Sequence, residues 1–139
     1  MIEWIVQNFI AHPELDTAQL HYSGHGVPDE DPEKAGALAC ADHELHCWEL
    51  LDVINERCPN VRDVDFFLDS CGSGGAWYTA KARFGRWHNI KRIQFVCAVD
   101  YREEACNSEN GGYFTESLVE HWKEYGTPGW KPLSIYKDE

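Results

Sequence analysis

The sequence lacks the features of a membrane protein, a secreted disulfide scaffold or a repeat array. Its six cysteines form no CxxC pair, and 139 residues with 43% hydrophobic content need no disulfide staples. No apolar run reaches transmembrane length, and Glu3 stands where a secretory signal carries basic residues. Repeats and low-complexity tracts are also missing. We therefore expect a single domain over residues 1–139, in the reducing cytoplasm.

Basic residues are also scarce. Twelve Lys and Arg stand against 24 Asp and Glu, which gives a formal net charge of −12. A surface with this charge repels phosphate backbones and anionic lipids, so we expect neither nucleic-acid binding nor membrane binding. The acidic surface either keeps the protein soluble or attracts basic peptides and divalent cations.

Strands and helices alternate along the chain. Apolar spacing predicts helices over residues 3–11, 45–57 and 113–125, with a further one that loosens at Gly85 within 76–89. Apolar runs predict strands over residues 18–22, 37–40, 64–68, 93–99 and 133–136, and the polar segment 27–36 predicts a surface loop. This alternation predicts an α/β domain with a mainly parallel sheet, whose sites lie beyond the carboxyl ends of the strands.

Two glycine-rich motifs follow two of these predicted strands. The first is YSGHG, where glycines on both sides of His25 allow a sharp turn and an exposed imidazole. The second is DSCGSGG, which puts Cys71 among small residues after a buried strand. A nucleophilic thiol needs open access, a nearby base and free backbone N–H groups, and this pair of motifs can supply all three.

The two motifs together resemble the caspase and metacaspase superfamily of cysteine peptidases, and the metacaspase form is the closer match. FVCAVDYREEA and GGYFTESLVEHW resemble the next core strand, acidic loop and helix of that family, so the similarity runs from about Asp16 to Tyr125. The resemblance implies a caspase-like three-layer sandwich with a mainly parallel central sheet. It also implies a cysteine-type endopeptidase that acts on proteins or peptides.

The resemblance assigns roles to five residues. His25 would be the general base and Cys71 the nucleophile, with the backbone N–H groups of Gly26 and Cys71 as the oxyanion hole. Asp69 would line a pocket for Arg or Lys at P1, and Asp100 would supply a second acid. The alternative for the two acids is structural, with Asp69 capping a turn and Asp100 solvated in a loop.

The first strands of the family are missing before the segment that resembles it. We therefore expect an N-terminally truncated, partial catalytic domain, which an upstream segment or a partner subunit completes. An uncovered sheet edge would otherwise be prone to pairing. The same absence supports a second hypothesis, a catalytically inactive caspase-like adaptor, although the intact His/Cys pair favours an enzyme.

Two other clusters suggest cations. Cys40, His43, His46 and Cys47 are ligand types, but their spacing does not match ordinary zinc patterns, so we predict no metal site. The acidic loop that contains Asp29, Glu30, Asp31 and Glu33 makes calcium a candidate activator, as in many metacaspases, although no EF-hand spacing exists. No other cofactor is expected.

The segment between Cys71 and the next predicted strand is rich in basic residues. If the enzyme cleaves after Arg or Lys, this segment is a candidate for self-cleavage; otherwise it is a basic, exposed helix face. The residues concerned are Lys81, Arg83, Arg86 and Lys91.

Overall fold

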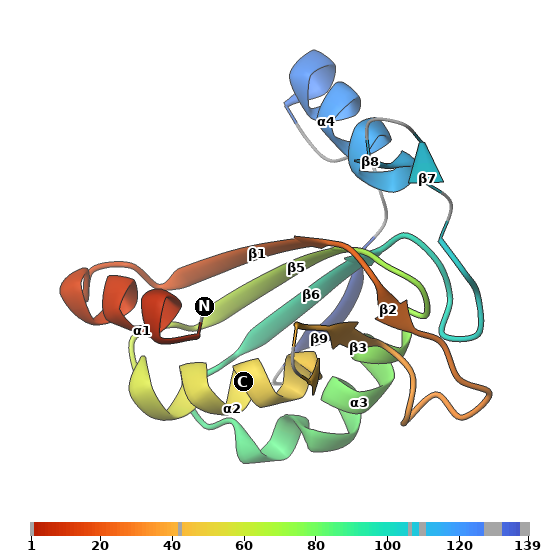
Figure 1. Ribbon diagram of the computed structural model, residues 1–139. Coiled ribbons are helices and arrows are strands. Elements are labelled where there is room, and N and C mark those ends of the chain that lie inside the picture. The colour runs from red at the N-terminus through yellow and green to blue at the C-terminus, as the bar shows by residue number, and fades with distance from the viewer. Residues whose placement is uncertain (1, 42, 106, 109–110, 127–131, 137–139) are drawn as a thin grey trace.

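A central sheet with helices on both faces organises the chain in the computed structural model (Figure 1). The structure describes residues 2–41, 43–105, 107–108, 111–126 and 132–136. The helices are α1 (Ile2–Ala11), α2 (Cys47–Arg57), α3 (Gly75–Arg83), the 3-10 turn η1 (Phe84–Arg86) and α4 (Tyr113–Tyr125). The strands are β1 (Thr17–Ser23), β2 (Gly26–Val27), β3 (Ala37–Ala39), β4 (Glu44–Leu45), β5 (Asp63–Asp69), β6 (Arg92–Cys97), β7 (Asn107–Ser108), β8 (Gly111–Gly112) and β9 (Leu133–Tyr136).

The central sheet has the strand order β1-β5-β6-β9. β1, β5 and β6 run parallel, and β9 is antiparallel to β6. The predicted mainly parallel sheet is therefore confirmed, and four of the five predicted strands lie in it, whereas the strand predicted at 37–40 corresponds to β3 in a separate sheet. Short strands β2, β3 and β4 form a separate antiparallel sheet, and β7 pairs with β8.

Alternating side chains of β5 divide the core into two layers. Val64, Phe66 and Leu68 point to the face covered by α1, α2 and α3, and they belong to the main hydrophobic cluster. Phe67 points to the other face, where it belongs to a smaller cluster with α4 through Phe114. A strand buried on both faces needs such an unbroken apolar run. The result is the predicted three-layer arrangement, with α4 on the opposite side of the sheet from the other helices (Figure 1).

β1 lies at one edge of the sheet. Among the described residues it pairs only with β5, and Ala18 is its one fully buried residue. Its outer edge therefore offers backbone groups for a further strand. Completion of the sheet by an upstream segment or a partner remains a prediction.

The segment after Cys71 is folded rather than extended. Lys81 and Arg83 lie in α3 and Arg86 lies in η1, which confirms the predicted helix that loosens at Gly85. A peptidase binds its substrate as an extended chain. Cleavage after Lys81, Arg83 or Arg86 would therefore require these helical turns to unfold locally, and self-cleavage remains a prediction beside the alternative of a basic helix face.

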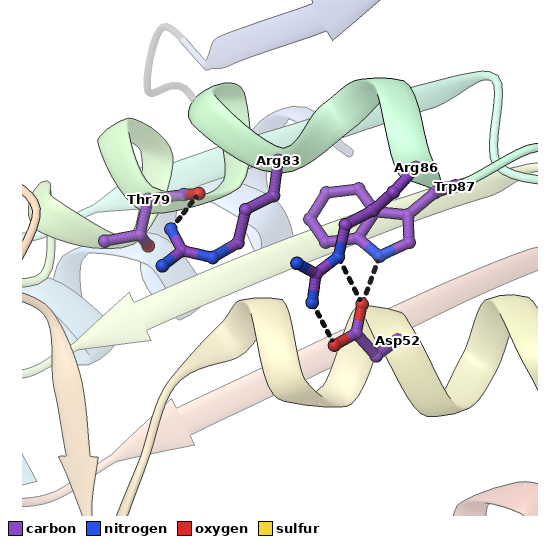
Figure 2. A network of polar contacts seen from close by, with 5 residues as sticks. All are labelled: Asp52, Thr79, Arg83, Arg86 and Trp87. Carbon is purple, nitrogen blue, oxygen red and sulfur yellow. Dashed lines mark hydrogen bonds and ion pairs between the residues drawn. The ribbon is translucent and has the colours of Figure 1, made fainter.

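Asp52 joins α2 to the segment that follows α3 (Figure 2). Its carboxylate accepts two hydrogen bonds from Arg86, at 3.0 and 2.6 Å, and one from the buried indole N–H of Trp87, at 2.7 Å. Burial disfavours the charged form of Asp52, but the hydrogen bonds and positive charges of its neighbours outweigh it. The pKa of Asp52 is therefore below its ordinary value.

No helix among the described residues has the length and apolar character needed to cross a membrane.

We predict that Asp52→Ala lowers the free energy of unfolding at pH 7 by about 1–3 kcal/mol, because the buried N–H of Trp87 then lacks an acceptor. Asp52→Asn keeps an acceptor and should lose less. Because the folded-state pKa of Asp52 is depressed, its ionic contribution is present above about pH 4 and is lost as the pH falls further. Urea unfolding at pH 7 and pH 3 measures both effects. Equal stability of wild type and Asp52→Ala at pH 7 would contradict the prediction.

Candidate active site

The two glycine-rich motifs lie at matching positions of paired strands. β1 and β5 are parallel and in register from Thr17 opposite Asp63 to Ser23 opposite Asp69. His25 and Cys71 each follow two residues after the end of their strand. The carboxyl ends of neighbouring parallel strands lie at the same end of a sheet, so the two turns start side by side.

Gly26 and Cys71 are in direct backbone contact. A Cβ added to Gly26 would lie 2.3 Å from the Cys71 carbonyl oxygen, 3.0 Å from the Cys71 nitrogen and 2.8 Å from the Ser70 Cβ. Only a residue without a side chain permits this approach. The glycine after His25 is therefore required by contact with the cysteine turn.

The backbone of His25 is held while its side chain is exposed. The carbonyl oxygen of His25 accepts a hydrogen bond from the Tyr22 hydroxyl at 2.7 Å and one from the Ala39 N–H at 2.9 Å. Burial is the main cause that raises the pKa of Tyr22, and the nearby Cys40 adds to it. The hydroxyl therefore stays protonated and can donate. The imidazole is exposed, which is compatible with exchange of protons with a substrate.

The loop after β6 lies against the cysteine turn. Gly72 adopts a φ of +66°, and its N–H donates to the Glu103 carbonyl at 2.8 Å. The Ala105 N–H donates to the Cys71 sulfur at 3.4 Å. Ser73 joins the same loop through its hydroxyl, which lies 3.3 Å from the Val99 carbonyl. The position of Cys71 is therefore fixed by contacts with residues far from it in the sequence.

The environments of the described cysteines differ. Burial raises the pKa values of Cys47, Cys58 and Cys97, the last to about 12, which disfavours their thiolates. Cys40 and Cys71 are half-buried. Of these two, Cys71 alone follows a strand of the central parallel sheet. Cys106 lies outside the described residues.

Asp69 is the buried acid of the site. Its side chain is 3% exposed, and its Oδ2 accepts hydrogen bonds from the Thr115 N–H at 3.0 Å and from the Thr115 hydroxyl at 2.5 Å. Thr115 lies in the first turn of α4, so Asp69 caps that helix from the neighbouring strand. Oδ1 has no hydrogen-bond partner among the described residues. Such a buried oxygen is costly unless a ligand satisfies it.

A cavity of about 300 Å³ lies beside Asp69. Its other walls are largely apolar and come from the loop after β6 and the start of α4. The lining residues are Asp69, Ala98, Val99, Ala105, Tyr113, Phe114 and Ser117. A long side chain with an apolar stem and a cationic end matches such a cavity.

Asp100 has a different position. It is exposed, its carboxylate accepts the Tyr101 N–H at 2.7 Å, and it does not line the cavity beside Asp69. The structure therefore does not bring the two predicted pocket acids together in that cavity.

Two further residues of the site were not identified from the sequence. A Cβ at Gly112 would lie 1.8 Å from Asp69 Oδ2, so this glycine makes room for the carboxylate, and Thr115 anchors it. Both belong to the GGYFT segment. That segment resembles the caspase family, but its contact with Asp69 spans more than 40 residues and leaves no local signal in the sequence.

Neither of the two clusters considered for cations forms a metal centre in the described part of the chain, where no three His, Cys, Asp or Glu side chains gather. In the acidic loop, the Asp29 carboxylate accepts the Asp31 N–H, and the Asp31 carboxylate accepts the Glu33 N–H. These bonds fold the loop upon itself. Calcium activation remains a prediction.

We predict that Gly26→Ala destabilises the chain by about 1–3 kcal/mol, because the new methyl group overlaps the Cys71 backbone. Gly85→Ala is the matched control: an added Cβ there meets nothing within 4 Å. It should change stability by less than about 0.5 kcal/mol. Thermal and urea unfolding of both variants provide the measurement, and equal effects would contradict the contact at Gly26.

Comparison with known proteins supports the interpretation of the fold. A search of the curated proteins finds no match to this sequence. Among solved structures, the crystal structure of protein GSU0716 from Geobacter sulfurreducens has a similar fold, with a TM-score of 0.53 at 20% sequence identity. The similarity covers 88% of this chain and 61% of that chain, so this chain spans less than two thirds of that protein.

The family comparison covers almost the whole sequence. Residues 1–137 match the family described as the caspase domain. This match and the parallel sheet with helices on both faces agree with the resemblance seen in the two motifs, and they support a cysteine-peptidase-like function. The chain belongs to the caspase domain family.

Proposed function

We propose that this chain is a cysteine endopeptidase that uses His25 and Cys71 and cleaves after Arg or Lys. The observation that carries the proposal is the backbone contact between Gly26 and Cys71 at the ends of two in-register parallel strands. Cys71 makes this contact itself, and His25 precedes Gly26 in the sequence. The contact therefore supports a base and a nucleophile that act on the same substrate bond.

The proposed reaction begins with proton transfer from the Cys71 thiol to His25. The sulfur then attacks the scissile carbonyl carbon, and a tetrahedral oxyanion forms. Collapse of this intermediate breaks the C–N bond, and His25 returns the proton to the leaving amine. Water, deprotonated by His25, then hydrolyses the thioester to release the carboxylic acid product and restore the thiol.

The oxyanion would be stabilised by the N–H groups of Gly26 and Cys71. The antiparallel ladder of β2 and β3 supports this role. Because His25 and Val27 are hydrogen-bonded toward β3, the intervening N–H of Gly26 points away from it. The N–H of Gly72 is already donated to Glu103, so it does not compete for the role. Pairs of backbone N–H donors are typical of oxyanion holes.

Two features of the turn lie next to the proposed nucleophile. The Ala105 N–H donates to the Cys71 sulfur and so helps to hold it in place. The α3 helix begins four residues after Cys71 in the sequence.

The basic P1 preference rests on Asp69. Its Oδ2 is used by Thr115, its Oδ1 is buried with no hydrogen-bond partner in the described part of the chain, and the residue lines the cavity. A guanidinium or ammonium group at the end of an apolar stem would satisfy this oxygen through a charge-assisted hydrogen bond. The net charge of −12 would also attract cationic peptides. We propose that Asp100 contributes to binding of the basic P1 side chain from a solvent-exposed position outside the cavity.

We predict that the purified chain cleaves fluorogenic peptides with Arg or Lys at P1, and that Cys71→Ala and His25→Ala each reduce kcat/KM by about a thousandfold or more. Peptides with Asp or Leu at P1 are the controls, and each assay runs with and without calcium. Cleavage after Asp would retain the enzyme and reject the basic preference. Undiminished cleavage in either variant would reject the dyad. No cleavage by wild type, even with the upstream sequence or a partner restored, would favour the adaptor hypothesis.

We predict that Asp69→Asn lowers kcat/KM for P1-Arg peptides by about 30-fold or more, because the cation loses its buried counter-charge. Asparagine retains an acceptor for Thr115, so α4 should stay in place, and thermal unfolding checks this. Asp100→Asn is the matched control, with an expected change within about threefold, since its carboxylate is exposed. A larger loss in Asp100→Asn than in Asp69→Asn would contradict the assignment.

A further inference from the structure

Asp69 is connected to a second strand through a chain of two hydrogen bonds. The Thr115 hydroxyl lies 2.5 Å from Asp69 Oδ2, and His21 Nε2 lies 3.2 Å from the same hydroxyl oxygen. His21 belongs to β1 and Thr115 to the first turn of α4. The oxygen of one threonine therefore links an exposed imidazole to the buried acid of the cavity.

The direction of both hydrogen bonds follows from the chemistry of the groups. The Thr115 hydroxyl has a single proton, and this proton is donated to Asp69 Oδ2. The Thr115 oxygen must then accept from His21, which requires a proton on Nε2. This assignment holds for the neutral Nε2–H tautomer and for the imidazolium, so the chain of bonds persists when His21 changes charge.

The surroundings of His21 are acidic on the strand and helix packed against it. Phe67 of β5 lies opposite His21, with Asp65 and Asp69 next along the same face. Asp65 is engaged by Gln19, and Asp69 by Thr115. On α4, Glu116 follows Thr115. Of these acids, Asp69 alone lines the cavity. A proton gained by His21 thus adds a positive charge two hydrogen bonds away from the cavity acid.

We propose that His21 is a positioning residue that, through Thr115, sets the effective charge of Asp69, so that protonation of His21 weakens binding of a basic P1 side chain. This inference rests on the proposed function and adds a pH-dependent control to it. Among side chains at their ordinary pKa values, histidine is the one whose charge can change between about pH 5 and 8, so the test compares conditions at the two ends of that range. Because His21 is partly solvated, the effect is modest: about a two- to fivefold change in affinity, as for other exposed charge pairs.

The test measures peptide binding in the Cys71→Ala background, where no cleavage occurs. A short fluorescent peptide that ends in arginine amide is titrated at pH 5.5 and pH 8 by fluorescence anisotropy, with a citrulline peptide as the uncharged control. We expect the arginine peptide to bind about two- to fivefold more weakly at pH 5.5. His21→Gln, which keeps an N–H donor but cannot become charged, should reduce this ratio toward one.

Thr115 provides a second pair of variants. Thr115→Ser retains the hydroxyl and should keep the pH ratio, whereas Thr115→Val breaks the hydrogen-bond chain and should lose it. Thermal unfolding confirms that each variant is folded. A ratio in His21→Gln equal to that of the parent, or no pH dependence in the parent, would overturn the inference.

Failure of the proposed function is seen separately. If the arginine peptide binds the parent no more tightly than the citrulline peptide at pH 8, the basic pocket is wrong, and the inference fails with it. If arginine is preferred at pH 8 but His21→Gln changes nothing, the pocket stands and the role of His21 is rejected.

Discussion

The in-register pairing of β1 with β5 is the constraint on which the rest of the site depends. Because the two parallel strands are in register, the residues that follow them lie at the same end of the sheet. His25 and Cys71 therefore occupy equivalent positions after their strands. The turns can then close upon each other only where one of them has no side chain, and Gly26 supplies that position. A slip of one residue in the register would turn every side chain of one strand to the other face and separate the two turns.

Asp69, the last residue of β5, connects the sheet to α4 on its other face. One oxygen holds the first turn of α4, and the other is buried with no hydrogen-bond partner among the residues that the structure describes. The interpretation of Asp69 as a cap and its interpretation as a pocket acid are therefore compatible, because the two oxygens differ. The same helix contributes Phe114 and Ser117 to the cavity wall. A single carboxylate thus positions part of the pocket that we propose it serves.

The sequence was informative where the signal is local. The apolar runs at 64–68 and 93–99 predicted β5 and β6, and helical spacing predicted α2 and α4. The glycines around His25 and Cys71 indicated the turns. Contacts between segments had no such signal: neither the engagement of Asp69 by Thr115 nor the link to His21 follows from a periodic pattern. Asp100 shows the same limit, because its position after a strand did not reveal that its carboxylate turns toward Tyr101.

The two halves of the proposed dyad differ in how firmly the sheet holds them. β5 lies between two strands, and six of its seven residues are buried. β1 pairs on one side only among the described residues, and every second residue along it is exposed. The proposed nucleophile, Cys71, therefore follows an interior strand of the sheet, whereas the proposed base, His25, follows an edge strand. His21 shares that edge strand with the turn of His25. A strand added to the outer side of β1, where no strand pairs among the described residues, would act first on the proposed base and on His21 near Asp69, and only through them on Cys71.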